Sequence, residues 1–269
     1  MGPRRSGEIA RLIDQSGLLK SLPVDSVQFS GRKQYLSDSR RQQSLEQFMD
    51  NQGMNLYQIV DTDEQRKSAL ELLDRVFTDK TVDSDNNYQY LEFIGDGVLA
   101  DVVRVYLWGK LPRGEHQRYL KMHNQLASKV VSNNFIAIIA EDMNLLELLK
   151  RDEDLVRDSF RTEIMQTETN NRRLKLKVKQ KLAERNKKWG ADCLEALLGA
   201  LVLIDPSHNL VRQLMEPYLK DVVGLVTEKE RNAANIDADR LEIKFKKLYG
   251  DQSGGNGQRV QKMNHRQTR

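Results

Sequence analysis

The chain has 269 residues, of which 39% are hydrophobic, and this length and composition allow one large core rather than a disordered chain. The net charge of +4 and the isoelectric point near 9.0 favour an anionic partner and leave nucleic acid, an acidic protein and a membrane surface open. A single cysteine, Cys193, excludes an intrachain disulfide, and the lack of any run of about 18 apolar residues argues against a membrane span.

Helical periodicity dominates the sequence. Residues 1–53 are polar, with weak apolar periodicity around Ile9–Leu22, and we expect an N-terminal extension that is partly helical. The alternation of basic and apolar residues over 172–182 is compatible with a strand or with a short helix. Residues 229–269 begin charged and end in a Gly-rich basic tail that we expect to be flexible. Between these flanks, apolar residues recur at three- and four-residue steps, which predicts helices over 68–77, 90–108, 132–149 and 191–204. The fold class is therefore predicted to be all-α, with one domain over 54–228.

Two of the predicted helices carry acidic residues among apolar ones. Glu92 and Asp96 are four apart in QYLEFIGDGVL, and Asp192 and Glu195 are three apart in KWGADCLEALLGALV, so each pair projects from one face of its helix. Burying ionised carboxylates is costly, so these groups must be neutralised, paired or metal-bound. Four carboxylates without His or Cys favour Mg²⁺, with Mn²⁺ as the other choice, and such sites serve phosphoryl chemistry. Buried structural pairing is the alternative.

Four segments, in order, resemble the motifs of the ribonuclease III family. YQYLEFIGDGVL (88–99) is similar to the LEFLGDAVL-like signature helix, and KWGADCLEALLGALVLID (188–205) to the motif K-x-x-A-D-x-x-E-A-x-x-G-A. VVSNNFIAIIA (130–140) resembles LVxNxxLAxxA, and LLDRVFTDKT (72–81) resembles LxxAFTHKS. From the first motif to the last, the resemblance spans about 130 residues of the chain.

The resemblance implies an all-α endonuclease domain that homodimerises across its signature helices and binds double-stranded RNA in the valley so formed. By motif position, Glu92, Asp96, Asp192 and Glu195 would be the metal-binding and catalytic carboxylates of a Mg²⁺-dependent site. The implied reaction is attack of water on a phosphodiester, giving 5′-phosphate and 3′-hydroxyl ends with two-nucleotide 3′ overhangs. Lys188 matches the family's basic residue before the second motif. We consider two roles for it equally: contact with a phosphate or carboxylate, or a solvated lysine at the start of a helix.

Some positions depart from the family pattern. Gln89 stands where bacterial members usually have Glu, as it does in Dicer-like members, so we expect a eukaryotic-type protein. Asp79 replaces the usual His of the FTHKS-like segment, which we expect to leave the core carboxylates untouched. Gly97 costs a helix about 1 kcal/mol relative to Ala, and close approach of a partner helix would compensate for it. Glu115 is the candidate for a further family acid.

RNA affinity is expected to come from the catalytic domain, because residues 229–269 contain no recognisable double-stranded RNA-binding motif. The densest basic run, RRLKLKVKQKLAERNKK (172–188), has nine Lys and Arg against one Glu. A basic face binds duplex phosphates with little sequence choice, whereas a solvated helix face is the alternative. The predicted RNA contacts are Arg172, Arg173, Lys175, Lys177, Lys179 and Lys188.

The leading hypothesis is thus a double-strand-specific, Mg²⁺-dependent endoribonuclease of RNA processing. The alternative from another class is a non-catalytic RNA-binding or scaffold subunit of a ribonucleoprotein complex with the same fold. A third hypothesis is that the protein is an enzyme subunit whose RNA is delivered by a protein partner. That partner would bind residues 1–53 or 229–269. We expect an intracellular protein, with nucleus, cytoplasm and an organelle such as the mitochondrion left open. Of the remaining side chains, Cys193 and Trp189 are expected to be packed inside and His123 to be exposed.

Overall fold

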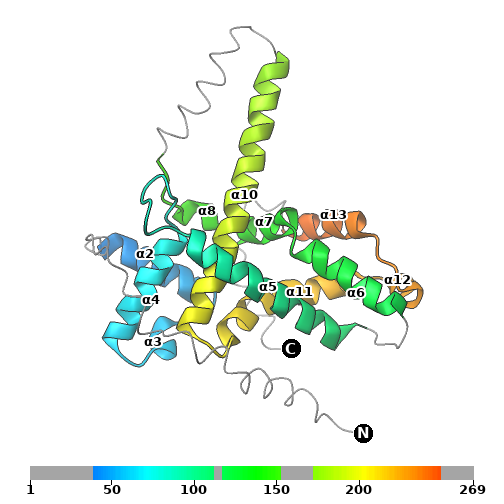
Figure 1. The fold of residues 1–269 in the computed structure, drawn as a ribbon, viewed down its shortest axis with the longest axis horizontal. Coiled ribbons are helices and arrows are strands. Elements are labelled where there is room, and N and C mark those ends of the chain that lie inside the picture. Colours follow the sequence, from blue (N-terminus) through cyan, green and yellow to red (C-terminus); the bar gives the residue numbers. More distant parts are fainter. Residues whose placement is uncertain (1–38, 112–116, 153–171, 250–269) are drawn as a thin grey trace. The chain divides into compact units, whose positions relative to one another are not determined.

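The structure, a computed structural model, describes residues 39–111, 117–152 and 172–249, and every regular element in these ranges is an α-helix (Figure 1). This confirms the predicted all-α fold. No helix within these ranges combines the length and the apolar character that crossing a membrane requires. In chain order the helices are α2 (Ser39–Asn51), α3 (Leu56–Ile59), α4 (Asp63–Val76), α5 (Gln89–Lys110), α6 (Gln117–Val130), α7 (Asn133–Asp142), α8 (Leu145–Leu148), α10 (Arg172–Ile204), α11 (Asn209–Leu225), α12 (Glu228–Ala233) and α13 (Ala238–Tyr249).

Helix α10 is the centre of the fold and packs on α4, α5, α7, α8 and α11 (Figure 1). Every residue from 189 to 202 is buried, so this part of the helix is covered on all sides. A helix covered all round is normally apolar all round. The two acids within that stretch therefore lie in the core, not on a solvated face.

Helices α5 and α10 touch backbone to backbone at two glycines. A Cβ atom added to Gly95 would lie 1.6 Å from the carbonyl oxygen of Glu195, and one added to Gly199 would lie 2.1 Å from that of Leu91. No real Cβ contact is that short, so only glycine permits this crossing. The contact brings the first turn of α5 against the buried part of α10.

Two of the predicted elements differ in detail from the structure. The segment 132–149 forms two helices, α7 and α8, because Asn144 adopts a left-handed conformation with φ of 55° between them. Asparagine is one of the few non-glycine residues that adopt this conformation readily. The ambiguous segment 172–182 is helical and belongs to the same helix as 191–204.

The described parts of both predicted extensions pack on the core. Leu45, Phe48 and Met49 of α2 are buried in the main hydrophobic cluster, and Arg41 forms an ion pair with the buried Asp74 of α4 at 2.8 Å. At the other flank, Phe245 of α13 stacks on Phe135 of α7 with ring centroids 4.1 Å apart. The extents predicted for the extensions themselves stay predictions.

Single side chains were predicted with mixed success. Cys193 and Trp189 are buried, as expected. The expectation for His123 is wrong, because this residue is 6% exposed and its ring lies 5.2 Å from that of Trp108. On α6, His123 follows the buried Met122 and precedes the buried Leu126, and the helix turns all three towards the core.

We expect Gly95→Ala and Gly199→Ala each to lower the free energy of unfolding by about 3 kcal/mol or more. The added methyl must push two backbones apart, which exceeds the usual cost of overpacking a core. Gly224→Ala on α11 is the matched control: a Cβ there meets nothing within 4 Å, so it should stabilise the helix by up to about 1 kcal/mol. Urea unfolding of the three variants measures this, and a Gly95→Ala protein as stable as wild type would contradict the close crossing.

Candidate metal centre

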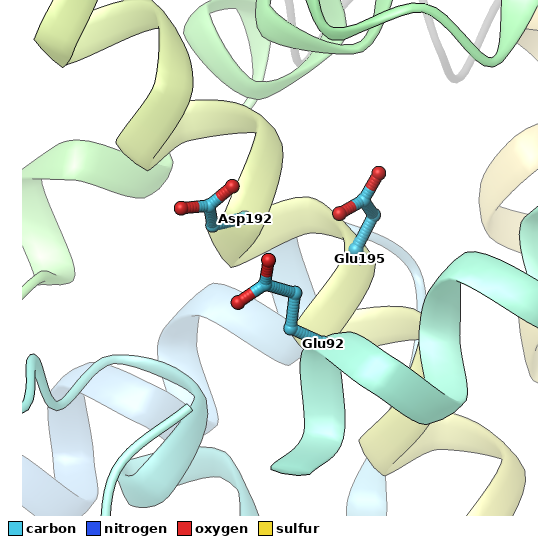
Figure 2. Close-up of side chains that lie close together, drawn as sticks. All are labelled: Glu92, Asp192 and Glu195. Carbon is cyan, nitrogen blue, oxygen red and sulfur yellow. The ribbon is translucent and has the colours of Figure 1, made fainter. Parts of the chain in front are cut away.

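Three of the four predicted carboxylates meet where α5 crosses α10. Glu92 lies in the first turn of α5, and Asp192 and Glu195 lie one turn apart on the buried part of α10. One carboxylate oxygen from each of the three lies within 4.8 Å of the other two. Figure 2 shows Glu92 reaching from α5 towards the two side chains of α10. The group consists of carboxylates alone, and such oxygen donors suit a hard divalent cation.

The fourth predicted carboxylate, Asp96, lies one turn further along α5 and is exposed. It is not part of the group of three. Its charge nevertheless helps to raise the pKa of Glu195, so the two acids lie within electrostatic reach. Asp96 therefore borders the group on its solvent side.

Burial and mutual repulsion make the group electrostatically unfavourable without a cation. Burial is the main cause that raises the pKa of Glu195 to about 8, and the charges of Asp96, Asp192 and Glu92 add to it. Burial and the charge of Asp192 also raise the pKa of Glu92. Like charges that are held together out of water favour protonation or a bound cation. The donor set thus fits a divalent metal ion.

Lys188 supplies the positive charge nearest to Asp192. Its ammonium group donates to both carboxylate oxygens of Asp192, at 3.0 Å each. The lysine side chain is 63% exposed, whereas that of Asp192 is 6% exposed. Burial still raises the pKa of Asp192, with this ion pair opposing the effect. Lys188 thus makes the carboxylate contact, and a phosphate contact stays a prediction.

Comparison with known proteins agrees with this geometry. Residues 89–206 match the family described as ribonuclease III domain. This part of the chain is a ribonuclease III domain. The chain is 32% identical over 91 residues to "Ribonuclease 3" of Zunongwangia profunda, and that match covers 32% of this chain and 36% of the relative.

Two further relatives match over longer segments. "Ribonuclease 3" of Tropheryma whipplei is 28% identical over 183 residues, which cover 66% of each chain. "Ribonuclease 3 2" of Nostoc sp. is 26% identical over 208 residues, which cover 77% of this chain and 66% of the relative. The match thus spans about a third of the length of the Zunongwangia profunda protein. It spans just under two thirds of the length of each of the other two relatives. The eukaryotic-type affiliation inferred from Gln89 stays a prediction.

Asp79, which precedes the matched segment in the sequence, lies closer to the site than expected. It is 3% exposed and accepts hydrogen bonds from the backbone N–H and hydroxyl of Thr81, at 2.9 and 2.7 Å, and from the hydroxyl of Tyr88 at 3.2 Å. Its charge adds to the raised pKa values of Asp192 and Tyr88. The four carboxylates are all present, as expected, but the charge of Asp79 acts on one of them, Asp192. No local signal indicates this burial, because Asp79 stands between the polar residues Thr78 and Lys80.

Several predicted residues cannot be placed in the site. Glu115 lies outside the described residues. The backbone of the predicted RNA contacts before Lys188 runs through α10, but their side chains are not among those described. The set comprises Arg172, Arg173, Lys175, Lys177 and Lys179.

The raised pKa of Glu195 predicts that stability falls with rising pH when divalent ions are absent. The folded-state pKa of about 8 exceeds the ordinary value of 4.5, so the folded protein binds the extra proton between these pH values and loses that advantage as pH rises through 8. Melting temperatures in EDTA should fall more steeply from pH 5 to pH 8 for wild type than for Glu195→Gln. Mg²⁺ at pH 8 should stabilise wild type more than the variant. Parallel profiles in EDTA, with equal responses to Mg²⁺, would contradict this account.

Proposed function

We propose that this protein is a Mg²⁺-dependent endoribonuclease that cleaves double-stranded RNA and leaves 5′-phosphate and 3′-hydroxyl ends with two-nucleotide 3′ overhangs. The observation that carries the proposal is the convergence of Glu92, Asp192 and Glu195 from two helices to within 4.8 Å. The match to the ribonuclease III domain supports the same reaction. Mn²⁺ has the same ligand preferences and is the expected substitute.

The proposed roles follow from position. Glu92, Asp192 and Glu195 would hold the cation, with Asp96 one turn away as the fourth acid. The bound Mg²⁺ would activate a water molecule and stabilise charge on the leaving oxygen. The carboxyl of Glu195, whose pKa is raised to about 8, would hold a proton at neutral pH without the ion and would be a ligand only in its deprotonated form. Lys188 keeps the carboxylate of Asp192 in place.

Glu195→Gln and Asp96→Asn should each reduce cleavage of an RNA duplex by at least about a hundredfold while leaving duplex binding intact. The amide keeps the shape of each side chain but removes the negative charge that would neutralise the metal ion. Size-mapped gels of a 5′-labelled duplex with Mg²⁺ measure the rate and the product ends. Glu216→Gln, at an exposed position of α11, is the control and should cleave as wild type does.

Cleavage that survives both changes would overturn the assignment of the site. If wild-type protein folds and dimerises but cleaves no duplex in Mg²⁺, the non-catalytic RNA-binding subunit becomes the better account.

The proposed enzyme is a homodimer that joins through α5. Tyr90, Phe93, Val105 and Trp108 are large apolar residues on this helix that are exposed in the single chain, and Phe93 is the most exposed of them at 79%. They follow one stripe together with Gly97, beside which a Cβ would meet nothing within 4 Å. Exposed apolar stripes of this kind often mark protein–protein interfaces. In a dimer with a two-fold axis, the stripe on α5 of one chain can pack against the same stripe of the second chain. The terminal segments remain the proposed docking sites for other protein partners.

Phe93→Asp should weaken the dimer by about 2 kcal/mol or more, because a carboxylate would replace a ring at the centre of the interface. Sedimentation velocity over a concentration series measures the shift from dimer to monomer. Ile243→Asp on α13, another exposed apolar position, serves as the control and should remain dimeric. Wild-type protein that is monomeric throughout the series would refute the proposed dimer.

A further inference from the structure

Trp189 of α10 lies against two arginines from separate parts of the chain. The guanidinium carbon of Arg185 is 4.7 Å from the centre of the Trp189 ring, and that of Arg151 is 5.1 Å from it. Trp189 is buried, whereas both arginines are half-buried and keep part of their surface accessible. A ring face attracts and orients a guanidinium group through cation–π contact. The indole therefore gathers two positive charges at one place.

This place adjoins the carboxylate group. Arg185, Trp189 and Asp192 are spaced four and three residues apart, so they follow one side of α10. Seven residues of helix separate Arg185 from Asp192 by about 10 Å along the axis. Lys188, next to Trp189, already contacts Asp192. The two arginines thus lie about two turns from the proposed point of cleavage.

Arg151 is presented by a firmly anchored segment. The backbone N–H of Lys150 donates to the carbonyl of Phe77 at 2.7 Å, and its own carbonyl accepts from the N–H of Asp79 at 2.9 Å. The ammonium group of Lys150 also binds both carboxylate oxygens of the buried Asp74, at 2.8 and 2.9 Å. Anchors on both sides of the peptide chain fix the backbone from which Arg151 projects.

A further anchor follows Arg151 directly. The backbone N–H of Asp152 donates to the hydroxyl of Thr81 at 3.3 Å, and that hydroxyl donates to Asp79 beside the site. The position of Arg151 is therefore coupled to the segment that also supports the carboxylates. A residue whose backbone is already fixed loses less conformational freedom when its side chain binds a ligand.

We propose that Arg151 and Arg185, held on Trp189, form a clamp for a backbone phosphate of the RNA duplex, about two helical turns from the cleaved bond. Guanidinium groups bind phosphate through paired N–H donors, and two of them at one ring provide a concentrated positive site for an anion. The clamp rests on the proposed function, since it takes the same duplex that the carboxylates cut. Arg185 belongs to the basic run 172–188 but is not one of its predicted RNA contacts, and Arg151 lies outside that run.

The test is the salt dependence of duplex binding by the full chain. Fluorescence anisotropy of a labelled RNA duplex, in EDTA to prevent cleavage and over about 50 to 200 mM KCl, gives the slope of log K against log salt. Arg151→Gln and Arg185→Gln keep long side chains but remove the charge, and each should reduce the slope by about 1. Affinity at about 0.15 M salt should fall about fivefold for each, as expected for the loss of one phosphate contact.

Three controls separate RNA contact from a structural effect. The double variant should lose a slope of about 2, and Arg151→Lys, which restores the charge, should recover most of the loss. Lys220→Ala removes an exposed cation from α11 and should leave the slope unchanged. Melting temperatures show whether each variant is folded under the conditions of the binding assay.

The clamp and the proposed function fail in different ways. If wild type cleaves the duplex in Mg²⁺ but both glutamine variants bind with the wild-type slope and affinity, the clamp is refuted, and the two arginines serve only to hold α10 against residues 150–152. If wild type cleaves no duplex while the variants still lose their slopes, the clamp stands and the nuclease function is what fails.

Discussion

The backbone contact between α5 and α10 at Gly95 and Gly199 is the constraint on which the rest of this structure depends. Because neither helix has a side chain at the crossing, residues within one turn of it on both helices lie at contact distance. Glu92 on one side and Glu195 on the other are among them. The same contact places the crossing inside the core, where α10 is buried on all sides. The site is thus a direct product of how the two helices pack.

This packing makes the folded protein carry an electrostatic cost. Burial and repulsion raise the pKa values of Glu92, Asp192 and Glu195 together, so the folded chain without a cation is less stable at neutral pH than its apolar core alone would allow. The Lys188 ion pair offsets part of the cost at Asp192. Protonation of Glu195 or a bound divalent cation would offset the remainder, and functional sites commonly trade stability for function.

The sequence predicted which faces carry the acids but not everything that surrounds them. The three-residue spacing of Asp192 and Glu195 places both in the group with Glu92, because helical periodicity reports the face of a single element. The four-residue spacing of Glu92 and Asp96 does not bring Asp96 into that group. The burial of Asp79 and His123, and the meeting of Arg151 with Trp189, depend on contacts between segments that are far apart in sequence. Periodicity carries no information about which element covers a given face. The break at Asn144 was missed because the apolar pattern continues through it.

Helix α10 also explains why most of its basic residues do not neutralise the carboxylates of the site. Its described side chains are exposed or half-exposed up to Lys188, and from Trp189 to residue 202 they are all buried. Lys181 and Lys187 before this boundary are exposed, so water screens their attraction to the acids, whereas Lys188 at the boundary pairs directly with Asp192. The acids after the boundary lie in a medium of low polarity. A polyanion that approaches the exposed part meets positive charge first. In the proposed reaction the RNA backbone would reach the acids only where a divalent cation neutralises them, so the boundary at Lys188 and Trp189 would order binding before chemistry.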